Sequence, residues 1–254
     1  MQKKMWLEIG CFLAILLAVT PAGAEKSLSP AELVAVTGEV EILRAGTETW
    51  QPASSGQKVE SGDRVRTAGD ASAGVQLGDG SSIQIEPGSE FSLQTVLRDS
   101  ATGDVEYVFG FTKGKVTAQV NPITENSVFK IQTPVTTINI PRGAVDPTLP
   151  IAFNPDGSMT VTSTEGPFEL TGEGDISYTA TLETGETALL EYNAETGELR
   201  ITSVNGTFEV VGPDGKTYVL NTGDTIVLTK GAATFIPLGG PLEDPPPGGS
   251  IFEP

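Results

Sequence analysis

The sequence contains no histidine, and Cys11 is its only cysteine. Cys11 lies in an N-terminal segment that we expect to be removed. The mature chain would then hold no disulfide, no zinc site built from cysteine and histidine, and no imidazole base to activate a nucleophile. We therefore predict that the protein is not an enzyme, and we assign no catalytic, cofactor-binding or metal-binding residues. The binding residues stay unknown at this stage.

Basic residues are also scarce, with 15 Lys and Arg against 33 Asp and Glu and a net charge of −18. Nucleic-acid binding depends on Lys and Arg that neutralise phosphates, so a nucleic-acid partner is not expected. Adhesion to anionic lipid is disfavoured for the same reason. The remaining partners are a protein or a polysaccharide of the cell envelope.

The N-terminus has the pattern of a secretory signal peptide. Lys3 and Lys4 precede an uncharged run over residues 9–23, and Ala22-Gly23-Ala24 forms a small-residue cleavage site. The apolar run is short for a bilayer-spanning helix, which needs about 20 residues. We predict export to the periplasm or the extracellular space and no stable membrane insertion after cleavage.

The rest of the chain reads as short strands separated by tight turns. Apolar and polar residues alternate over 39–43, 74–77, 82–85, 115–120 and 129–132, which places the apolar set on one face of a sheet. Turn dipeptides such as Asp79-Gly80 and Asn205-Gly206 separate the runs. The sequence predicts an all-β protein, with one short helical turn from the capping pattern Ser29-Pro30-Ala31-Glu32.

The chain repeats itself towards its C-terminus. Residues 161–170 match 201–210 at an offset of 40, and residues 182–187 match 220–225 at an offset of 38. Self-similarity at this period favours stacked repeats of the β-solenoid or β-roll kind. The alternative is a β-sandwich whose hairpins resemble one another. In either case Phe168 and Phe208 occupy equivalent positions that we expect to face the core.

These features divide the chain into four parts. Residues 1–24 form the signal peptide, and 25–150 a first β domain. Residues 151–237 hold the C-terminal β repeats, with tandem units near 161–192 and 201–230. Residues 238–254 are rich in proline and glycine, including Pro245-Pro246-Pro247, and we expect a disordered tail.

Residues 34 to 150 resemble the FecR domain. The resemblance rests on an ordered series of short stretches rather than on one motif: Gly38-Glu39-Val40, Trp50, Gly62-Asp63-Arg64-Val65-Arg66-Thr67, Val75-Gln76-Leu77, Asp79-Gly80-Ser81-Ser82-Ile83, Pro87-Gly88-Ser89, Lys113-Gly114-Lys115-Val116, Phe129-Lys130-Ile131-Gln132-Thr133-Pro134 and Arg142-Gly143. The family pattern continues with a threonine after Arg-Gly, where this chain has Ala144.

The resemblance implies a place in envelope signalling. The best-known FecR-domain proteins are periplasmic sensors that carry signals from an outer-membrane receptor to a cytoplasmic sigma factor. That role needs a cytoplasmic segment and a transmembrane helix, whereas only eight residues precede the apolar run here. We therefore expect the domain without the anti-sigma function.

Several residues could carry chemistry, and each has a simpler interpretation. Trp50 could stack on a sugar, but we expect packing in the core or at an edge. Arg64 and Arg66 alternate with Val65 and should share one solvated face, and Arg142 should pair with a carboxylate. The Asp residues lie in turns without a calcium-loop pattern, so turn chemistry explains them: Asp63, Asp70, Asp79, Asp156, Asp214 and Asp224.

The leading hypothesis is a non-catalytic binding or scaffold protein of the cell envelope with a FecR-like domain, whose ligand is a polysaccharide or a protein partner. The alternative is a soluble periplasmic component of a FecR-type signalling pathway. A glycan-active enzyme is a weaker third hypothesis, because two carboxylates suffice for that chemistry.

The signal-peptide prediction has a direct test. N-terminal sequencing of the protein from an envelope fraction should begin at Glu25, because the site after Ala24 is the one that signal peptidase recognises. A chain that starts at Met1 and sediments with membranes would contradict it.

Overall fold

The computed structural model describes residues 26–142, 144, 146–172 and 174–239. The predicted signal peptide and almost all of the predicted tail lie outside these residues. Every regular element within them is a strand. The described part of the chain has no helix long and apolar enough to cross a membrane.

The strands form two large sheets. Sheet A has 12 strands, which are, in spatial order, β21 (Thr217–Leu220), β20 (Phe208–Val211), β17 (Tyr178–Leu182), β16 (Phe168–Gly172), β13 (Thr137–Asn139), β12 (Val128–Gln132), β10 (Val105–Lys113), β9 (Glu90–Arg98), β6 (Arg64–Thr67), β3 (Val40–Leu43) and β4 (Trp50–Pro52), with β1 (Ser27–Leu28) paired to β9.

Sheet B has 11 strands. In spatial order they are β23 (Ala232–Ile236), β22 (Thr225–Thr229), β19 (Glu198–Asn205), β18 (Thr187–Asn193), β15 (Met159–Thr162), β14 (Thr148–Phe153), β11 (Lys115–Gln119), β8 (Ser82–Ile85), β7 (Ser72–Leu77), β2 (Ala31–Thr37) and β5 (Lys58–Val59).

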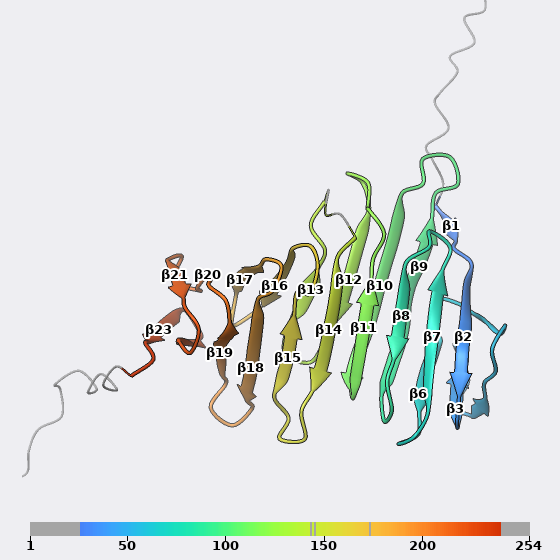
Figure 1. Ribbon diagram of the computed structural model, residues 1–254, viewed down its shortest axis with the longest axis horizontal. Coiled ribbons are helices and arrows are strands. Elements are labelled where there is room, and N and C mark those ends of the chain that lie inside the picture. The colour runs from blue at the N-terminus through green and yellow to red at the C-terminus, as the bar shows by residue number, and fades with distance from the viewer. Residues whose placement is uncertain (1–25, 143, 145, 173, 240–254) are drawn as a thin grey trace, which may run out of the picture.

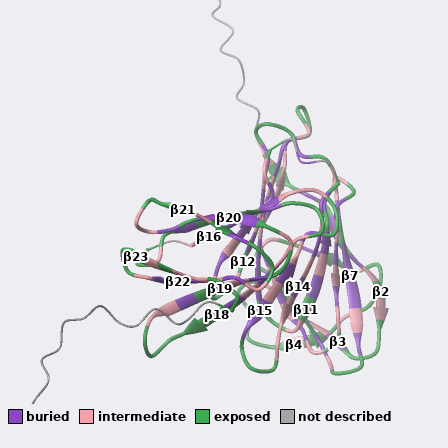
Figure 2. Ribbon diagram, turned by 60° about the vertical axis from the view of Figure 1, so that its left-hand side comes forward, coloured by how far each residue is buried: buried purple, intermediate pink, exposed green. Residues whose placement is uncertain are grey.

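The two sheets face each other and extend along one axis (Figure 1). Alternate residues of each strand are buried, as in β17, where Tyr178, Ala180 and Leu182 point inwards and the threonines between them are exposed. The buried side chains of both sheets form one continuous apolar cluster. Figure 2 shows this buried set along the strands, with exposed residues concentrated in the turns. The arrangement is that of a long β-sandwich.

The chain builds this sandwich in pairs of strands. From β12 onwards it places two consecutive strands in sheet A, then two in sheet B, and repeats the pattern to β23. Almost all pairings are antiparallel. The exception is β10 with β12, which are parallel because only the single strand β11 lies between them in the other sheet.

The sequence repeats correspond to this path. The strands β15 to β18 and β19 to β22 follow the same course, from sheet B through two strands of sheet A and back to sheet B. Phe168 and Phe208 are both buried at equivalent positions, as predicted. The Thr-Gly-acid turns of the two units also match, since Gly185 and Gly223 have φ values of 90° and 93°, a backbone conformation that glycine adopts without strain.

The repeats therefore stack, but as a two-sheet sandwich. No closed solenoid coil runs through the described residues. The reason is local: from β12 onwards every second turn returns the chain to the same sheet before it crosses over, whereas a solenoid crosses after each strand. Of the two architectures predicted from the sequence, the β-sandwich describes how the two sheets are arranged. The predicted repeat describes how successive pairs of strands are added along them.

The predicted helical turn at residues 29–32 is wrong. Ala31 and Glu32 begin strand β2, where they pair with Leu77 and Gln76 of β7. Ala31 and Leu33 are buried and Glu32 is exposed, which is the alternation of a strand. Sheet pairing on both sides of Ala31 overrides the capping pattern, because local helix propensity is weak compared with tertiary packing.

The paired repeats make a stability prediction. Replacing Phe208 with Ala should lower the free energy of unfolding by about 3–5 kcal/mol, because a buried aromatic side chain is lost. Replacing its exposed neighbour Glu209 should change that free energy by less than about 0.5 kcal/mol. Denaturant melts of both variants measure the two values. A harmless Phe208→Ala, or a damaging Glu209→Ala, would show that the register is wrong.

Candidate functional site

The most developed hollow lies at the mouth between the two sheets, where hairpin turns of both meet. Two adjoining hollows of about 600 Å³ and 210 Å³ share the side chain of Tyr192. We call their combined surface the Tyr192 groove. Its sheet B side is formed by the β14–β15 and β18–β19 turns, and its sheet A side by the β12–β13 and β16–β17 turns.

Tyr192 lies near the end of β18 and links both parts of the groove. Ala188 and Leu190 on the same strand are buried, and Tyr192 continues their face by two residues. It pairs across the sheet with Leu199 of β19. The strand extends past the covered core at this point, so 48% of Tyr192 is exposed. A large amphipathic side chain is thus held on a rigid strand and faces solvent.

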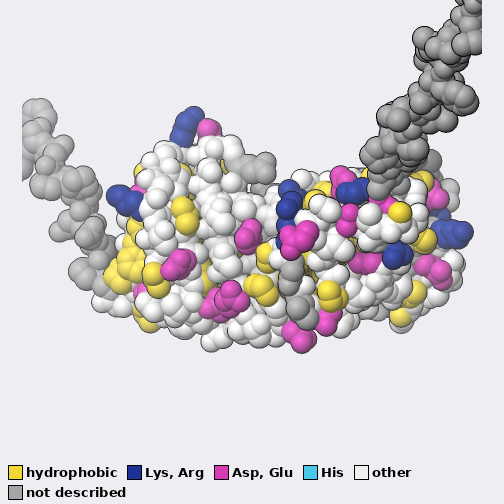
Figure 3. Space-filling view, turned by 90° about the horizontal axis from the view of Figure 1, so that it is seen from above, with side chains coloured by type: hydrophobic (Ala, Val, Ile, Leu, Met, Phe, Trp, Pro, Cys, Tyr) yellow, Lys and Arg dark blue, Asp and Glu magenta, His cyan; other side chains and the backbone are white. Residues whose placement is uncertain are grey.

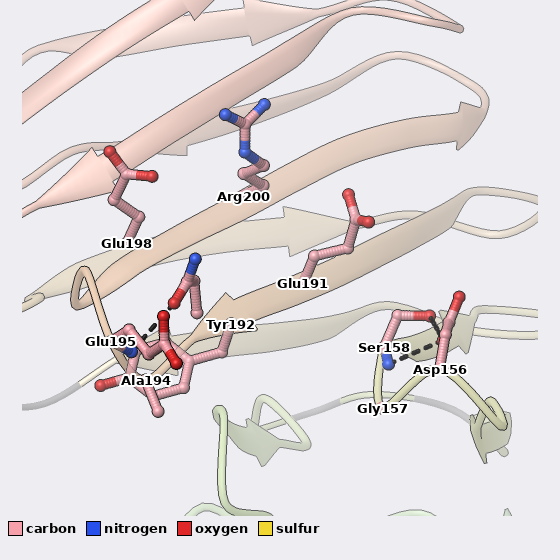
Figure 4. A pocket seen from close by; sticks show the side chains of 10 residues that line it. Asp156, Gly157, Ser158, Glu191, Tyr192, Ala194, Glu195, Glu198 and Arg200 are labelled. Atoms are coloured by element: carbon pink, nitrogen blue, oxygen red, sulfur yellow. Dashed lines mark hydrogen bonds between the residues drawn. The ribbon is translucent and has the colours of Figure 1, made fainter.

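One side of the groove is acidic. Asp156, Glu191, Glu195 and Glu198 line it together with Arg200. Figure 4 shows Glu191 and Arg200 projecting from neighbouring strands on the face of sheet B opposite to Tyr192. The described residues contain no group of three or more His, Cys, Asp and Glu side chains placed to hold a metal ion. The carboxylates are spread along the rim, which suits attraction of a cationic surface.

The acidic turns are held by their own hydrogen bonds. Asp156 accepts bonds from the backbone N–H of Ser158 at 3.0 Å and from its hydroxyl at 2.7 Å, and these bonds lower the pKa of Asp156. Asn193 accepts bonds from the backbone N–H groups of Glu195 and Thr196. Both turns therefore keep a fixed shape, and Asp156 stays charged at neutral pH.

The other side of the groove is apolar. Val135, Ile176 and Leu199 line it beside Tyr192. Tyr178 is buried beneath, and its hydroxyl donates a 2.7 Å hydrogen bond to Thr136, while burial raises the pKa of Tyr178. The groove therefore places an apolar strip next to an acidic rim, an arrangement that fits a peptide segment in which basic and apolar side chains alternate.

The residues singled out from the sequence lie elsewhere. Trp50 is half-buried on edge strand β4, below the guanidinium groups of Arg66 at 4.3 Å and Arg64 at 5.7 Å. Arg66 also pairs with Glu41 at 2.6 Å, and Arg64 pairs with Glu90. The edge-packing interpretation of Trp50 and the shared exposed face of the two arginines are confirmed.

The prediction that Arg142 pairs with a carboxylate finds no support among the residues that the structure describes. Its side chain is exposed, and none of the carboxylates in the described residues lies within ion-pair distance of it. It lines a shallow hollow on sheet A with Lys130, Asn139 and Glu169.

Turn chemistry explains most of the Asp residues, as predicted. Asp63 is buried and accepts bonds from the backbone of Ala45 and Glu60 and from Arg44. Asp79 and Asp214 accept bonds from the backbone two residues ahead. Asp224 accepts bonds from the backbone N–H groups of Asn221 at 2.9 Å and Leu238 at 2.8 Å. These carboxylates fasten turns to strands.

Sequence reasoning missed the Tyr192 groove. A usable signal was one of the places where the two repeats differ: the first unit has Tyr192-Asn193 where the second has Lys230-Gly231. The first unit thus has an aromatic residue and a longer, acidic turn at this place. Core packing does not require either feature, and such a difference in a loop indicates a functional role.

Comparison with known proteins identifies a domain. Residues 63–167 match the family model described as FecR protein, so the chain contains a FecR domain over this range. The match confirms the resemblance expected from the sequence and extends it past residue 150. No curated protein sequence matches the chain.

Two crystal structures of a candidate anti-sigma factor from Parabacteroides distasonis are similar to the chain. They were determined at 2.50 Å and 1.65 Å resolution and align with TM-scores of 0.40 and 0.41. In both cases the identity is 17%, and the alignment covers 55% of this chain. The chain spans 59% of the length of those solved chains.

The turn carboxylates predict a pH dependence of stability. Hydrogen bonds from the Leu238 and Asn221 backbone lower the pKa of Asp224 in the folded state. The Asp224 carboxylate therefore adds to the free energy of unfolding at pH values above its unfolded pKa of about 3.9. This stabilisation is lost as the pH falls through the pKa that Asp224 has in the folded protein. Asp224→Asn should lower the melting temperature most at pH 7, and the gap from the wild type should close at acidic pH.

Thermal melts at several pH values measure this gap. Asp70→Asn, a change at an exposed turn residue, is the matched control and should have little effect at any pH. An Asp224→Asn gap that stays constant down to acidic pH would contradict the assigned role of the charge.

Proposed function

We propose that this protein is an exported, non-catalytic component of a FecR-type envelope signalling pathway, and that it binds a protein partner through the Tyr192 groove. The observation that carries the proposal is the groove itself: an exposed tyrosine on a rigid strand between an apolar strip and an acidic rim. The FecR domain supports the pathway, and the groove supports the mode of binding.

The position of the groove supports its link to the FecR domain. Val135 and Asp156 belong to the segment that matches the family, whereas Tyr192, Glu195 and Arg200 belong to the repeats that follow it. The two sheets run from one part into the other without interruption. A partner bound in the groove would therefore contact both parts and hold them as one surface.

The charge of the groove defines the partner. Carboxylates dominate the rim in a chain whose net charge is −18, so the partner should present Lys or Arg next to apolar side chains. Such charge complementarity accelerates association and selects among partners, and it weakens as salt screens it over about 10 Å at 0.1 M. Tyr192 supplies the central contact, since tyrosine is enriched among residues that dominate binding energy.

Photo-crosslinking tests the proposal in the intact cell. A photoreactive phenylalanine analogue at position 192 should form a discrete crosslink to another envelope protein, identified by mass spectrometry. The matched control places the same analogue at Val204, which is also 48% exposed and lies outside the groove. That position should give no such product.

A charge variant adds a second readout. The triple change Glu191→Gln, Glu195→Gln and Glu198→Gln should reduce the crosslink yield roughly tenfold, because three rim charges of about 0.5 kcal/mol each are lost. A crosslink to polysaccharide only, equal yields at positions 192 and 204, or an unchanged yield in the charge variant would contradict the proposed function.

A further inference from the structure

Both sheets end at the same end of the molecule with free strand edges. Sheet A ends at β21 and sheet B at β23, and among the described residues each of these strands has a paired neighbour on one side only. Neither strand carries a charged residue or a proline: β21 reads Thr-Tyr-Val-Leu and β23 reads Ala-Ala-Thr-Phe-Ile. Free edges of this kind are templates for pairing with another strand.

The apolar interior is also uncovered at this end. Tyr218, Ala233 and Phe235 pack against the core but are only partly buried, unlike their counterparts further along the sandwich. On the outer face of the last two strands of sheet A, Val211 and Val219 add exposed apolar surface at the same end. Figure 3 shows hydrophobic side chains gathered at the left-hand end of the molecule, which is the end of β21 and β23 in Figure 1. Stacked repeats need a polar cap at such an end.

The opposite end is protected. Its edge strands are β4, with three residues including Pro52, and β5, with only two residues. Behind them Val59, Leu33 and Ile42 are fully covered. Short edge strands and an edge proline are recognised ways to prevent pairing. The contrast shows that the open end is a specific feature of the C-terminal repeats.

The charge distribution fits association at the open end. Residues 198–239 contain four acidic and three basic residues, although the whole chain has a net charge of −18. Two of the basic residues, Lys216 and Lys230, are already paired with Asp214 and Asp175. The repulsion that opposes contact between acidic copies elsewhere is therefore nearly absent here, because charges beyond about 10 Å are screened.

We infer that a second copy of this chain covers the open end, so that the two molecules join end to end in a two-fold symmetric dimer. A two-fold axis perpendicular to both sheets pairs β21 with β21 of the other copy and β23 with its β23, antiparallel in each case. A single two-fold rotation therefore gives both edge strands a hydrogen-bonded partner and covers the exposed interior. A single strand from another partner would satisfy only one edge.

The experiment measures the molar mass of the purified chain by sedimentation velocity and light scattering over a range of micromolar concentrations. The expected result is a reversible dimer of twice the 26.5 kDa chain mass. The double variant Val219→Lys and Thr234→Lys places a charge on each edge strand and should be monomeric over the same range. Both changed positions are exposed, so the fold should persist.

Val204→Lys is the matched control. Val204 is exposed to the same degree as Val219, but it lies on β19, which is paired on both sides, so this variant should remain dimeric. A wild-type chain that is monomeric at all concentrations would overturn the inference, as would a dimer that persists in the edge variant or that Val204→Lys also abolishes. A full chain that is monomeric, and that dimerises only when it is truncated after Gly239, would also overturn the inference. It would show that the chain's own tail covers the open end.

Discussion

The structure depends on one continuous layer of apolar side chains between two sheets. Every strand except β1 and β4 contributes residues to it, and the buried residues of the FecR domain and of the C-terminal repeats belong to the same cluster. With a single cysteine the chain can form no internal disulfide. The apolar layer therefore supplies the stabilisation, at roughly 25 cal/mol for each Å² of apolar surface buried. The aromatic group of Phe91, Tyr107, Phe109 and Phe129 fills the widest part of it.

Much of this fold can be predicted from the sequence because the two signals involved are local. Alternation over four or five residues places the strands, and Asx-Gly pairs place the turns. The equivalence of Phe168 and Phe208 follows from the same pattern. Whether a turn returns the chain to the same sheet or sends it across is decided by packing between distant strands, so the choice between solenoid and sandwich stayed open. The misassigned helical turn has the same origin, since Ala31 owes its strand conformation to Val59 and Leu77.

The groove shows why a binding site is harder to predict than a core. Its residues come from four turns spread over the sequence, and only the folded sheets bring Val135, Asp156, Ile176 and Tyr192 together. None of them belongs to a recognisable motif. Residues that looked distinctive in the sequence, such as Trp50 with Arg64 and Arg66, turn out to secure an edge strand instead. In this chain the residues that stand out in the sequence are therefore not the ones that line the groove.

Growth by hairpin pairs explains both the groove and the open end. Each added pair extends one of the two sheets without changing the core, so the turns at the mouth are free to differ in length, and one of them carries Tyr192. The same mode of growth contains no internal stop, because every new pair presents a new edge in its sheet. Growth must be ended by blocking those edges, as Pro52 and the two-residue strand β5 do at the first end. The last pair, β22 and β23, ends without such a block, and its uncharged edge is the physical reason to expect another strand beside it.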